Sequence, residues 1–214
     1  MASRRPAPEE LARPPRTRSL AVVRDAAAGC TACELYQRAT QTVFGAGAAH
    51  PVMMLVGEQP GDSEDRAGVP FVGPAGRVLE EALERAGLAA ARRYVTNAVK
   101  HFKHEPRGKR RLHKKPNTAE MMACQFWLEQ ELAAVRPLLV IALGSTAARA
   151  LLGRQVRVLA ERGRWLQAPG GGEVLVTVHP SSVLRAADRA SRAAAMDAMV
   201  DDLEVAARRL ARKG

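Results

Sequence analysis

Apolar and polar residues follow one another in blocks that predict strands and helices in turn. Short apolar runs at 51–58, 93–99 and 137–144 have the length of strands, and the first and third are continuous enough to be buried on both faces. Between them, 74–88 and 117–135 repeat their apolar side chains with helical spacing. The pattern therefore predicts strands that alternate with helices.

The rest of the chain continues this alternation. Residues 145–153 predict a helix capped by Ser145 or Thr146, and residues 164–168 and 173–179 predict a hairpin joined through a Pro-Gly turn. Strands that alternate with helices imply right-handed crossovers. We therefore expect an α/β fold with a parallel sheet covered by helices on both faces.

The two ends of the chain differ in composition. Residues 188–213 predict a closing amphipathic helix, whereas residues 1–20 are rich in Pro and Arg and predict a disordered basic tail. A single domain over 21–214 fits the length of 214 residues and the apolar fraction of 47%. Because no run of eighteen uncharged apolar residues is present, we expect a soluble cytoplasmic protein with no membrane segment.

The net charge of +11 is concentrated rather than spread. Residues 1–20 hold five Arg and two Glu, and residues 100–115 hold eight Lys or Arg and one Glu. A nearly neutral domain with one basic loop is typical of a polyanion-binding protein, and nucleic acid is the commonest polyanion. Within this loop, "GKRRLHKK" places His113 alone among five cations, either as a further solvated group or as a reactive one.

Ligands of parallel α/β sheets bind beyond the carboxyl ends of the strands. This rule selects the turn at 57–62, Asn97, the "GST" after the third strand, and the "HPSS" that begins at His179. Here His179 either donates to a developing oxyanion or simply belongs to a helix-capping turn. The Val183–Leu184 pair beside Arg185 could wedge into a base stack.

The three cysteines are too few for a disulfide framework. Cys30 and Cys33 form a C-x2-C pair, and with Cys124 they suggest a metal site that needs one further ligand. Cys124 could instead be an ordinary core residue, because it lies on the apolar stripe of its helix. The histidines that could complete the site are His50, His101 and His104.

Five motifs in order carry a resemblance to a known family. They read "GEQPGDSEDRAGVPFVGPAG", "YVTNAVKHFK", "GKRRLHKKP", "LGSTAARALLG" and "VHPSSVLR". Over about residues 28–205 the chain resembles the uracil-DNA glycosylase superfamily, with most similarity to the UdgX type, a relative of the iron-sulfur family 4 enzymes. The resemblance implies a three-layer α/β/α sandwich around a central four-stranded parallel sheet, and a monomer that binds uracil-containing DNA, with any preference for single strands left open.

The resemblance also implies roles for individual residues. Members of this family flip uracil out of DNA, because the glycosidic bond is inaccessible within the base stack. Phe71 would stack on the base, Asn97 would read its O4 and N3 edge, and His179 would donate to O2 of the departing uracil. The other substrate contacts would come from the turn that holds Gly57, Gln59 and Asp62, and from Ser181 and Ser182 as phosphate contacts.

In the UdgX type, a histidine of the basic loop attacks the sugar carbon and leaves the protein joined to DNA. That residue would be His113, since a neutral imidazole is nucleophilic near pH 7. Glu58 would position it or remove its proton, and Gln59 would order the loop by hydrogen bonding. The residues expected to contact DNA phosphates are Lys109, Arg110, Arg111 and Arg185. A conventional glycosylase that turns over and a noncatalytic nucleic-acid-binding module are the alternatives.

The resemblance further implies a 4Fe-4S cluster held by Cys30, Cys33, His101 and Cys124. Family 4 enzymes carry a cysteine where this chain has His101, which changes the expected stability and potential of the cluster. Zinc remains an alternative on the identity of the ligands, and His104 competes with His101. Since the basic loop lies between His101 and Cys124, the cluster would pin both of its ends.

Overall fold

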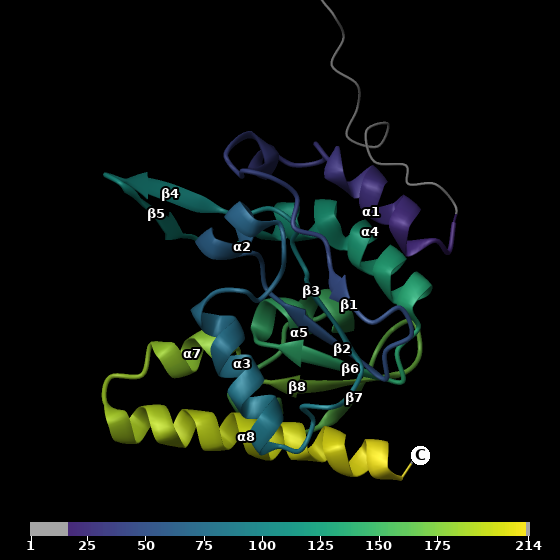
Figure 1. Ribbon diagram of the computed structural model, residues 1–214, viewed down its shortest axis with the longest axis vertical. Coiled ribbons are helices and arrows are strands. Elements are labelled where there is room, and N and C mark those ends of the chain that lie inside the picture. Colours follow the sequence, from purple (N-terminus) through teal and green to yellow (C-terminus); the bar gives the residue numbers. More distant parts are fainter. Residues whose placement is uncertain (1–16, 213–214) are drawn as a thin grey trace, which may run out of the picture.

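The computed structural model describes residues 17–212, so the predicted tail at 1–20 lies almost wholly outside the described residues. One mixed sheet of six strands forms the centre (Figure 1). Its order is β1 (Ala46–Gly47), β3 (Arg93–Asn97), β2 (Met53–Gly57), β6 (Leu139–Leu143), β8 (Glu173–Thr177) and β7 (Trp165–Gln167). The four inner strands are parallel, and both edge strands are antiparallel to their neighbours.

The predicted four-stranded parallel sheet is therefore the middle of a larger mixed sheet. The predicted hairpin accounts for one edge, because β7 pairs with β8 in antiparallel register. The other edge, β1, is two residues long and carries no alternating apolar pattern that would reveal it. Its pairing with β3 depends on contacts distant in sequence, which local pattern does not encode.

Helices cover both faces of the sheet, which gives the expected three layers (Figure 1). The α3 (Pro74–Arg85), α7 (Pro180–Leu184) and α8 (Arg189–Ala211) helices cover one face, and α1 (Leu20–Ala28), α4 (Thr118–Val135) and α5 (Ser145–Leu152) cover the other. Alternate residues of β2 enter the two cores, Met53 and Leu55 on one side and Met54 and Val56 on the other. This explains why the strand is apolar at every position.

Helix starts follow the predicted caps in one case and depart from them in another. Asn117 accepts a hydrogen bond from the backbone of Glu120, whose carboxylate accepts one from Asn117, so the predicted capping arrangement is confirmed. The α5 helix instead begins after Gly144, whose φ of 88° only glycine adopts without strain. The predicted Ser145 or Thr146 cap is wrong because the Thr146 hydroxyl donates to Glu58.

The basic stretch is not an irregular loop. It forms an antiparallel hairpin of β4 (His104–Arg107) and β5 (Arg110–His113), which projects from the body of the protein (Figure 1). Gly108 at the turn has a φ of 58°, as tight hairpin turns require. Three short helices were also not predicted: η1 (Glu34–Gln37), α2 (Asp62–Ala67) and α6 (Val158–Glu161). No described helix is long and apolar enough to cross a membrane.

Candidate active site

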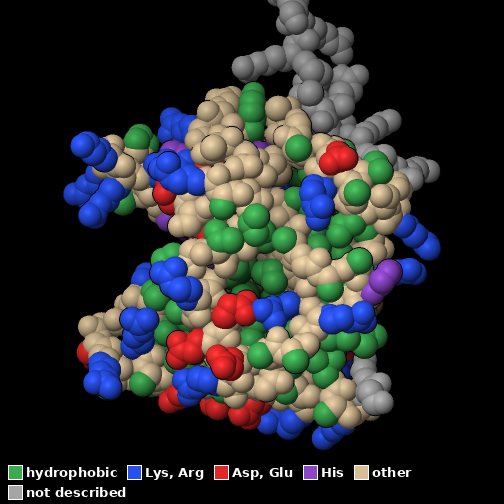
Figure 2. All heavy atoms as spheres, in the orientation of Figure 1, with side chains coloured by type: hydrophobic (Ala, Val, Ile, Leu, Met, Phe, Trp, Pro, Cys, Tyr) green, Lys and Arg blue, Asp and Glu red, His purple; other side chains and the backbone are tan. Residues whose placement is uncertain are grey.

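A cavity of about 810 Å³ lies beyond the carboxyl ends of the parallel strands, between the hairpin and α7. Figure 2 shows the molecule hollowed on this side, below the cluster of basic side chains on the hairpin. The predicted site residues that line it are Glu58, Gln59, Asp62, Phe71, Asn97, His113, His179, Ser181 and Arg185. The fold thus gathers into one cavity residues that the sequence spreads over five segments.

Asn97 ends β3 and is 2% exposed. Its side-chain oxygen, Oδ1, is buried and has no hydrogen-bond partner among the described residues. Gly57 lies opposite it on β2, and a Cβ atom there would come within 2.4 Å of this Oδ1 and 2.6 Å of Phe71 Cζ. Gly57 is therefore needed for the close packing of Asn97 and Phe71. The Oδ1 of Asn97 is a buried acceptor that a hydrogen-bond donor on a ligand would satisfy.

Phe71 has a backbone φ of 57°, a left-handed conformation that is uncommon for an aromatic residue. A Cβ atom at Gly76 would lie 1.7 Å from the Phe71 carbonyl oxygen, so only glycine permits this turn. Conformations of this kind cost on the order of 1–3 kcal/mol and cluster at functional sites. The result is a half-buried ring in the cavity wall, 6.2 Å from the ring of His179.

His179 precedes α7, and its ring orientation is set by Ser181. The Nδ1 atom accepts a hydrogen bond from the backbone N–H of Ser181 at 3.1 Å, so the ring proton of the neutral form is on Nε2. Burial, together with the charges of Arg185 and His113, lowers the pKa of His179 to about 4. The side chain is thus a neutral N–H donor at pH 7.

The two predicted phosphate contacts hold His179 in place. Ser181 Oγ lies 2.8 Å from the Nδ1 of His179 and accepts a hydrogen bond from Arg185. Ser182 donates its hydroxyl to the His179 carbonyl and does not line the cavity. This is the helix-capping turn that the sequence offered as an alternative, and it also presents His179 to the cavity.

His113 ends β5, with 48% of its side chain exposed. Its Nε2 lies 3.6 Å from Glu58 Oε1, beyond a hydrogen bond but within ion-pair distance. Partial burial lowers the pKa of His113, while Glu58 raises it and Arg185 lowers it. The ring is therefore unprotonated at neutral pH. Thr146 donates its hydroxyl to the other carboxylate oxygen and fixes Glu58.

Gln59 closes the base of the hairpin. Its side-chain amide nitrogen donates to the carbonyls of Lys103 and Lys114, and its oxygen accepts from the backbone N–H of Lys103. The backbone of Lys114 also donates to Lys103. The predicted hydrogen bonding between Gln59 and the basic segment is present, and it fixes the strand that carries His113.

The predicted phosphate contacts on the hairpin divide into two groups. Lys109 and Arg110 are exposed near its tip. Arg111 instead forms ion pairs with Asp62 and Asp65 on α2, and its side chain is only 17% exposed. Its guanidinium anchors the hairpin to α2, so it is less available to a phosphate than Lys109 or Arg110.

Two further corrections concern residues around the cavity. Val183 is fully buried in the core and cannot act as a wedge, whereas Leu184 lines the cavity. Glu64 was missed, although its carboxylate accepts from the backbone of Gly61 at 3.1 Å and of Gly73 at 2.7 Å. A Glu three residues after a glycine turn was a usable signal for this contact. The carboxylate joins the two loops that flank the cavity.

Cys30 and Cys124 belong to one buried cluster with Val99 and Trp127, and the partly buried Cys33 packs against it. Cys30 Sγ accepts from the indole of Trp127 at 3.1 Å, and Cys124 Sγ accepts from the backbone of Lys100 at 3.2 Å. These N–H donors are of the kind that stabilise thiolate ligands, so the donor chemistry fits an iron-sulfur cluster.

The arrangement of the four predicted ligands differs from the expected site. Among residues 17–212 no three His, Cys, Asp or Glu side chains are grouped to hold a metal ion. His101 instead makes a 2.9 Å hydrogen bond with Thr42. Burial raises the pKa of Cys33, and it raises that of Cys124 to about 12, which keeps both thiols protonated here. Ligation requires the thiolates, and a bound metal ion itself favours them, because it deprotonates a coordinating thiol.

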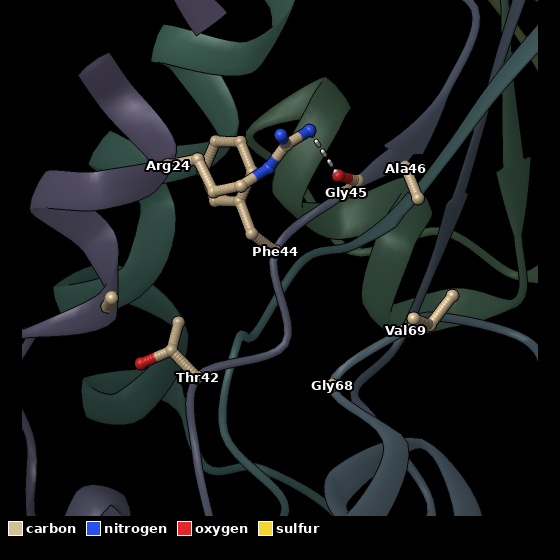
Figure 3. A pocket seen from close by; sticks show the side chains of 8 residues that line it. Arg24, Thr42, Phe44, Gly45, Ala46, Gly68 and Val69 are labelled. Carbon is tan, nitrogen blue, oxygen red and sulfur yellow. Dashed lines mark hydrogen bonds between the residues drawn. The ribbon is translucent and has the colours of Figure 1, made fainter. Parts of the chain in front are cut away.

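A second hollow of about 330 Å³ lies between α1 and the segment after α2 (Figure 3). Arg24 crosses the ring of Phe44 there and donates to the Gly45 carbonyl at 3.5 Å. Arg24 is the one titratable side chain among its lining residues. This hollow is therefore lined by no carboxylate, histidine or cysteine, whereas the larger cavity is lined by Glu58, His113 and His179.

The fold and the cavity define a class of protein: an α/β protein with a cavity lined by an aromatic ring, a buried amide and a neutral histidine. The sequence profile of the uracil DNA glycosylase superfamily matches residues 44–204. The chain belongs to this superfamily.

Similar proteins with assigned names support the same family. The chain is 39% identical over 163 residues to the type-4 uracil-DNA glycosylase of Pyrobaculum aerophilum, covering 73% of this chain and 80% of the relative. It is 36% identical over 157 residues to the type-4 uracil-DNA glycosylase of Thermotoga maritima, covering 73% and 78%. The corresponding protein of Archaeoglobus fulgidus is 31% identical, with 72% and 78% covered.

Proposed function

We propose that this protein excises uracil from DNA. The observation that carries the proposal is the buried Oδ1 of Asn97, an acceptor without a partner among the described residues. The N3–H of a flipped uracil would satisfy it, and the amide N–H2 beside it would donate to O4. Cytosine presents an acceptor at N3 and a donor at its 4-position, so both contacts would be mismatched. Phe71, in the same cavity, offers a ring for stacking.

In this proposal the departing uracil is stabilised by a neutral donor. The bond between C1′ and N1 breaks, and its electron pair passes to the uracil ring and collects on O2. Nε2–H of His179 donates to that oxygen, and a pKa of about 4 keeps the ring in the neutral form at physiological pH. Fixed donors aimed at developing charge are the largest single contribution in many enzymes.

We further propose that His113 captures the sugar. The lone pair of its neutral imidazole forms a bond to C1′, which is electron-poor once uracil departs, and the other ring nitrogen then releases its proton. Glu58 is positioned to assist, since its Oε1 lies 3.6 Å from Nε2 of His113. The products are free uracil, which takes up a proton, and DNA joined to the protein.

A glycosylase that turns over is the second candidate. The names of the relatives favour it, since they are type-4 uracil-DNA glycosylases. In that mechanism Glu58 would orient a water molecule toward C1′, and His113 would only contact phosphate. The two mechanisms share the release of uracil and differ in what becomes of the sugar.

One experiment separates these mechanisms. The protein is mixed with single-stranded DNA that contains one uracil, and the products are run on a denaturing gel after boiling in detergent. A slower DNA band that disappears after protease treatment is the result expected from capture by His113. Free DNA that alkali cleaves at the former uracil indicates turnover. Intact, retained uracil DNA would leave a binding module as the remaining function.

DNA is proposed to lie across the cavity, with the hairpin tip and α7 on its two sides. Lys109 and Arg110 on the tip and Arg185 next to α7 are exposed cations. Such cations bind phosphate without regard to sequence, which suits an enzyme that reads one base.

We also propose that Cys30, Cys33, His101 and Cys124 hold a 4Fe-4S cluster once His101 leaves Thr42 and the thiols ionise. The cluster would supply a covalent tie between the segments before and after the hairpin. A brown protein with visible absorbance, lost together with iron on chelation, is the expected result. A colourless protein that contains zinc would overturn this assignment.

A further inference from the structure

Lys100 and Glu131 form an ion pair in the interior of the protein, and both side chains are 0% exposed. Lys100 lies three residues beyond Asn97, and Glu131 lies on α4. A buried ion pair is often no more stable than two well-packed apolar side chains, because both charges lose their hydration. Stability alone therefore does not account for the pair.

The ammonium group of Lys100 has three acceptors, as many as it can serve. Besides Glu131, it donates to the Thr96 hydroxyl at 2.8 Å and to the Asn97 carbonyl at 2.7 Å. The third contact is made with the main chain of the residue whose side-chain amide lies in the cavity.

The Asn97 carbonyl needs a donor from outside the sheet. The N–H of Ala98 donates to Gly57 on β2 at 2.9 Å. Because this peptide is trans, the Asn97 carbonyl points the opposite way, toward the side of β1. There β1 pairs only with Tyr94 and Val95, so it ends before it could supply a donor. The ammonium of Lys100 takes the place of the missing strand.

Glu131 keeps that ammonium in place. Its carboxylate also accepts from the Tyr94 hydroxyl and the backbone N–H of Gly45, both at 2.9 Å. The main chain of Lys100 is held as well, since its N–H donates to Cys124 and its carbonyl accepts from Val43. Both ends of the Lys100 side chain are thus fixed.

We infer that Lys100 is a positioning residue for the base-reading amide, with Glu131 as its support. It holds the peptide after Asn97 so that the amide faces the uracil edge. The inference rests on the proposed excision of uracil. The hydrogen bond from Lys100 to the Asn97 carbonyl affects the orientation of the bound base and makes no contact with the DNA backbone. Its loss therefore lowers the rate of bond cleavage more than the affinity for DNA.

The test replaces the charged pair by a neutral one, in the double variant Lys100→Met/Glu131→Gln. Glutamine keeps an acceptor for Tyr94 and Gly45, and no unpaired charge is left in the interior. Uracil release is measured in a single turnover against protein concentration, with radiolabelled uracil. We expect the rate at saturation to fall about 100-fold, the scale of a misplaced reacting group, with less than a threefold change in the half-saturating concentration.

Thr96→Val is the matched control, because it removes the hydroxyl that accepts from Lys100 and donates to Glu131 in the same buried network, and it leaves the contact between Lys100 and Asn97. We expect it to keep the rate of the wild type to within about threefold, at a similar loss of thermal stability. Should the double variant fail to fold, Lys100→Gln/Glu131→Gln serves in its place, since it also leaves no unpaired charge and the shorter glutamine at position 100 does not reach both residue 131 and the carbonyl.

The outcomes are distinguishable. A folded double variant with the rate of the wild type overturns the inference alone, and so does an equal loss of rate in Thr96→Val. Cooling the double variant gives a further outcome: if its rate of uracil release then rises in proportion to its folded fraction, the inference is overturned. In that case Lys100 and Glu131 would have only a structural role. A wild-type protein that releases no uracil overturns the proposed function itself.

Discussion

Nε2 of His113 lies 3.6 Å from Oε1 of Glu58, although His113 ends a strand of the hairpin and Glu58 follows β2 of the central sheet. Each is held from behind: Glu58 by the hydroxyl of Thr146, and the strand of His113 by Gln59 at the base of the hairpin. A small movement of the hairpin would bring the two side chains into hydrogen-bond contact. Such contacts are often long in the absence of substrate and shorten when it binds.

Replacing the nucleophile should separate the two steps of the proposed reaction. His113→Ser is expected to release uracil at a rate within about tenfold of the wild type and to give no detergent-resistant DNA adduct, because serine lacks an activated lone pair at pH 7. The measurement pairs a uracil-release assay with a denaturing gel. Leu112→Ala is the control on the same strand, and a His113→Ser protein that still crosslinks would remove this histidine from the mechanism.

Replacing the carboxylate should slow capture of the sugar. Glu58→Gln keeps the size of the side chain but loses the negative charge, and we expect crosslinking to slow about 100-fold, the lower end of general-base effects. Rapid quench followed by gel analysis gives the rate. Thr146→Val should slow it less, since it removes only the hydroxyl that holds Glu58. An unchanged rate in Glu58→Gln would contradict the assignment.

The amide of Asn97 should govern the release of uracil. An ionised Asn97→Asp side chain has no donor for O4, and it places a charge beside that oxygen. Loss of one charged or buried hydrogen bond costs about 2–3 kcal/mol, so we expect at least a 30-fold fall in uracil release. The assay uses saturating protein and single-turnover conditions. Equal rates for the variant and the wild type would refute the role of Asn97.

Acid should stop crosslinking before it stops uracil release. Burial lowers the pKa of both histidines, so each ring is still neutral at a pH of 6.5, the ordinary pKa of a histidine. As the pH falls further, protonation of His113 removes its lone pair, while His179 holds its neutral form down to about pH 4. We expect released uracil without adduct in the interval between these transitions. Parallel profiles of both products from pH 4 to 8 provide the check, and coincident profiles would contradict it.

The cations of the hairpin should fall into two functional groups. Removing Lys109 and Arg110 is expected to lower the salt dependence of binding to single-stranded DNA by roughly 0.7 in log–log slope for each phosphate that the variant no longer neutralises. Arg111→Ala should change that slope little and loosen the hairpin, because it breaks the ion pairs with Asp62 and Asp65. Fluorescence anisotropy over a range of salt gives the slopes. Equal slope changes for Arg111 and Lys109 would contradict the anchoring role.

Local sequence predicted the inner strands and the main helices well. The apolar runs correspond to β2 and β6, and the Asn117 cap corresponds to the start of α4. The rule that ligands lie beyond the carboxyl ends of parallel strands selected most of the residues that line the cavity. The hairpin was missed because its strands are charged and mostly exposed, which leaves no alternating apolar pattern.

The sequence by itself determined the order of strands and helices and the residues available for chemistry, because those follow from short-range periodicity and from motifs. Only the tertiary structure decided that Arg111 anchors the hairpin and that Lys100 donates to Asn97. Pairings of this kind depend on which charged side chains meet after folding. A cation that stays exposed is available to solvent and to phosphate, whereas a buried and paired cation holds neighbouring groups in place. Similar cations in one sequence segment thus have different roles.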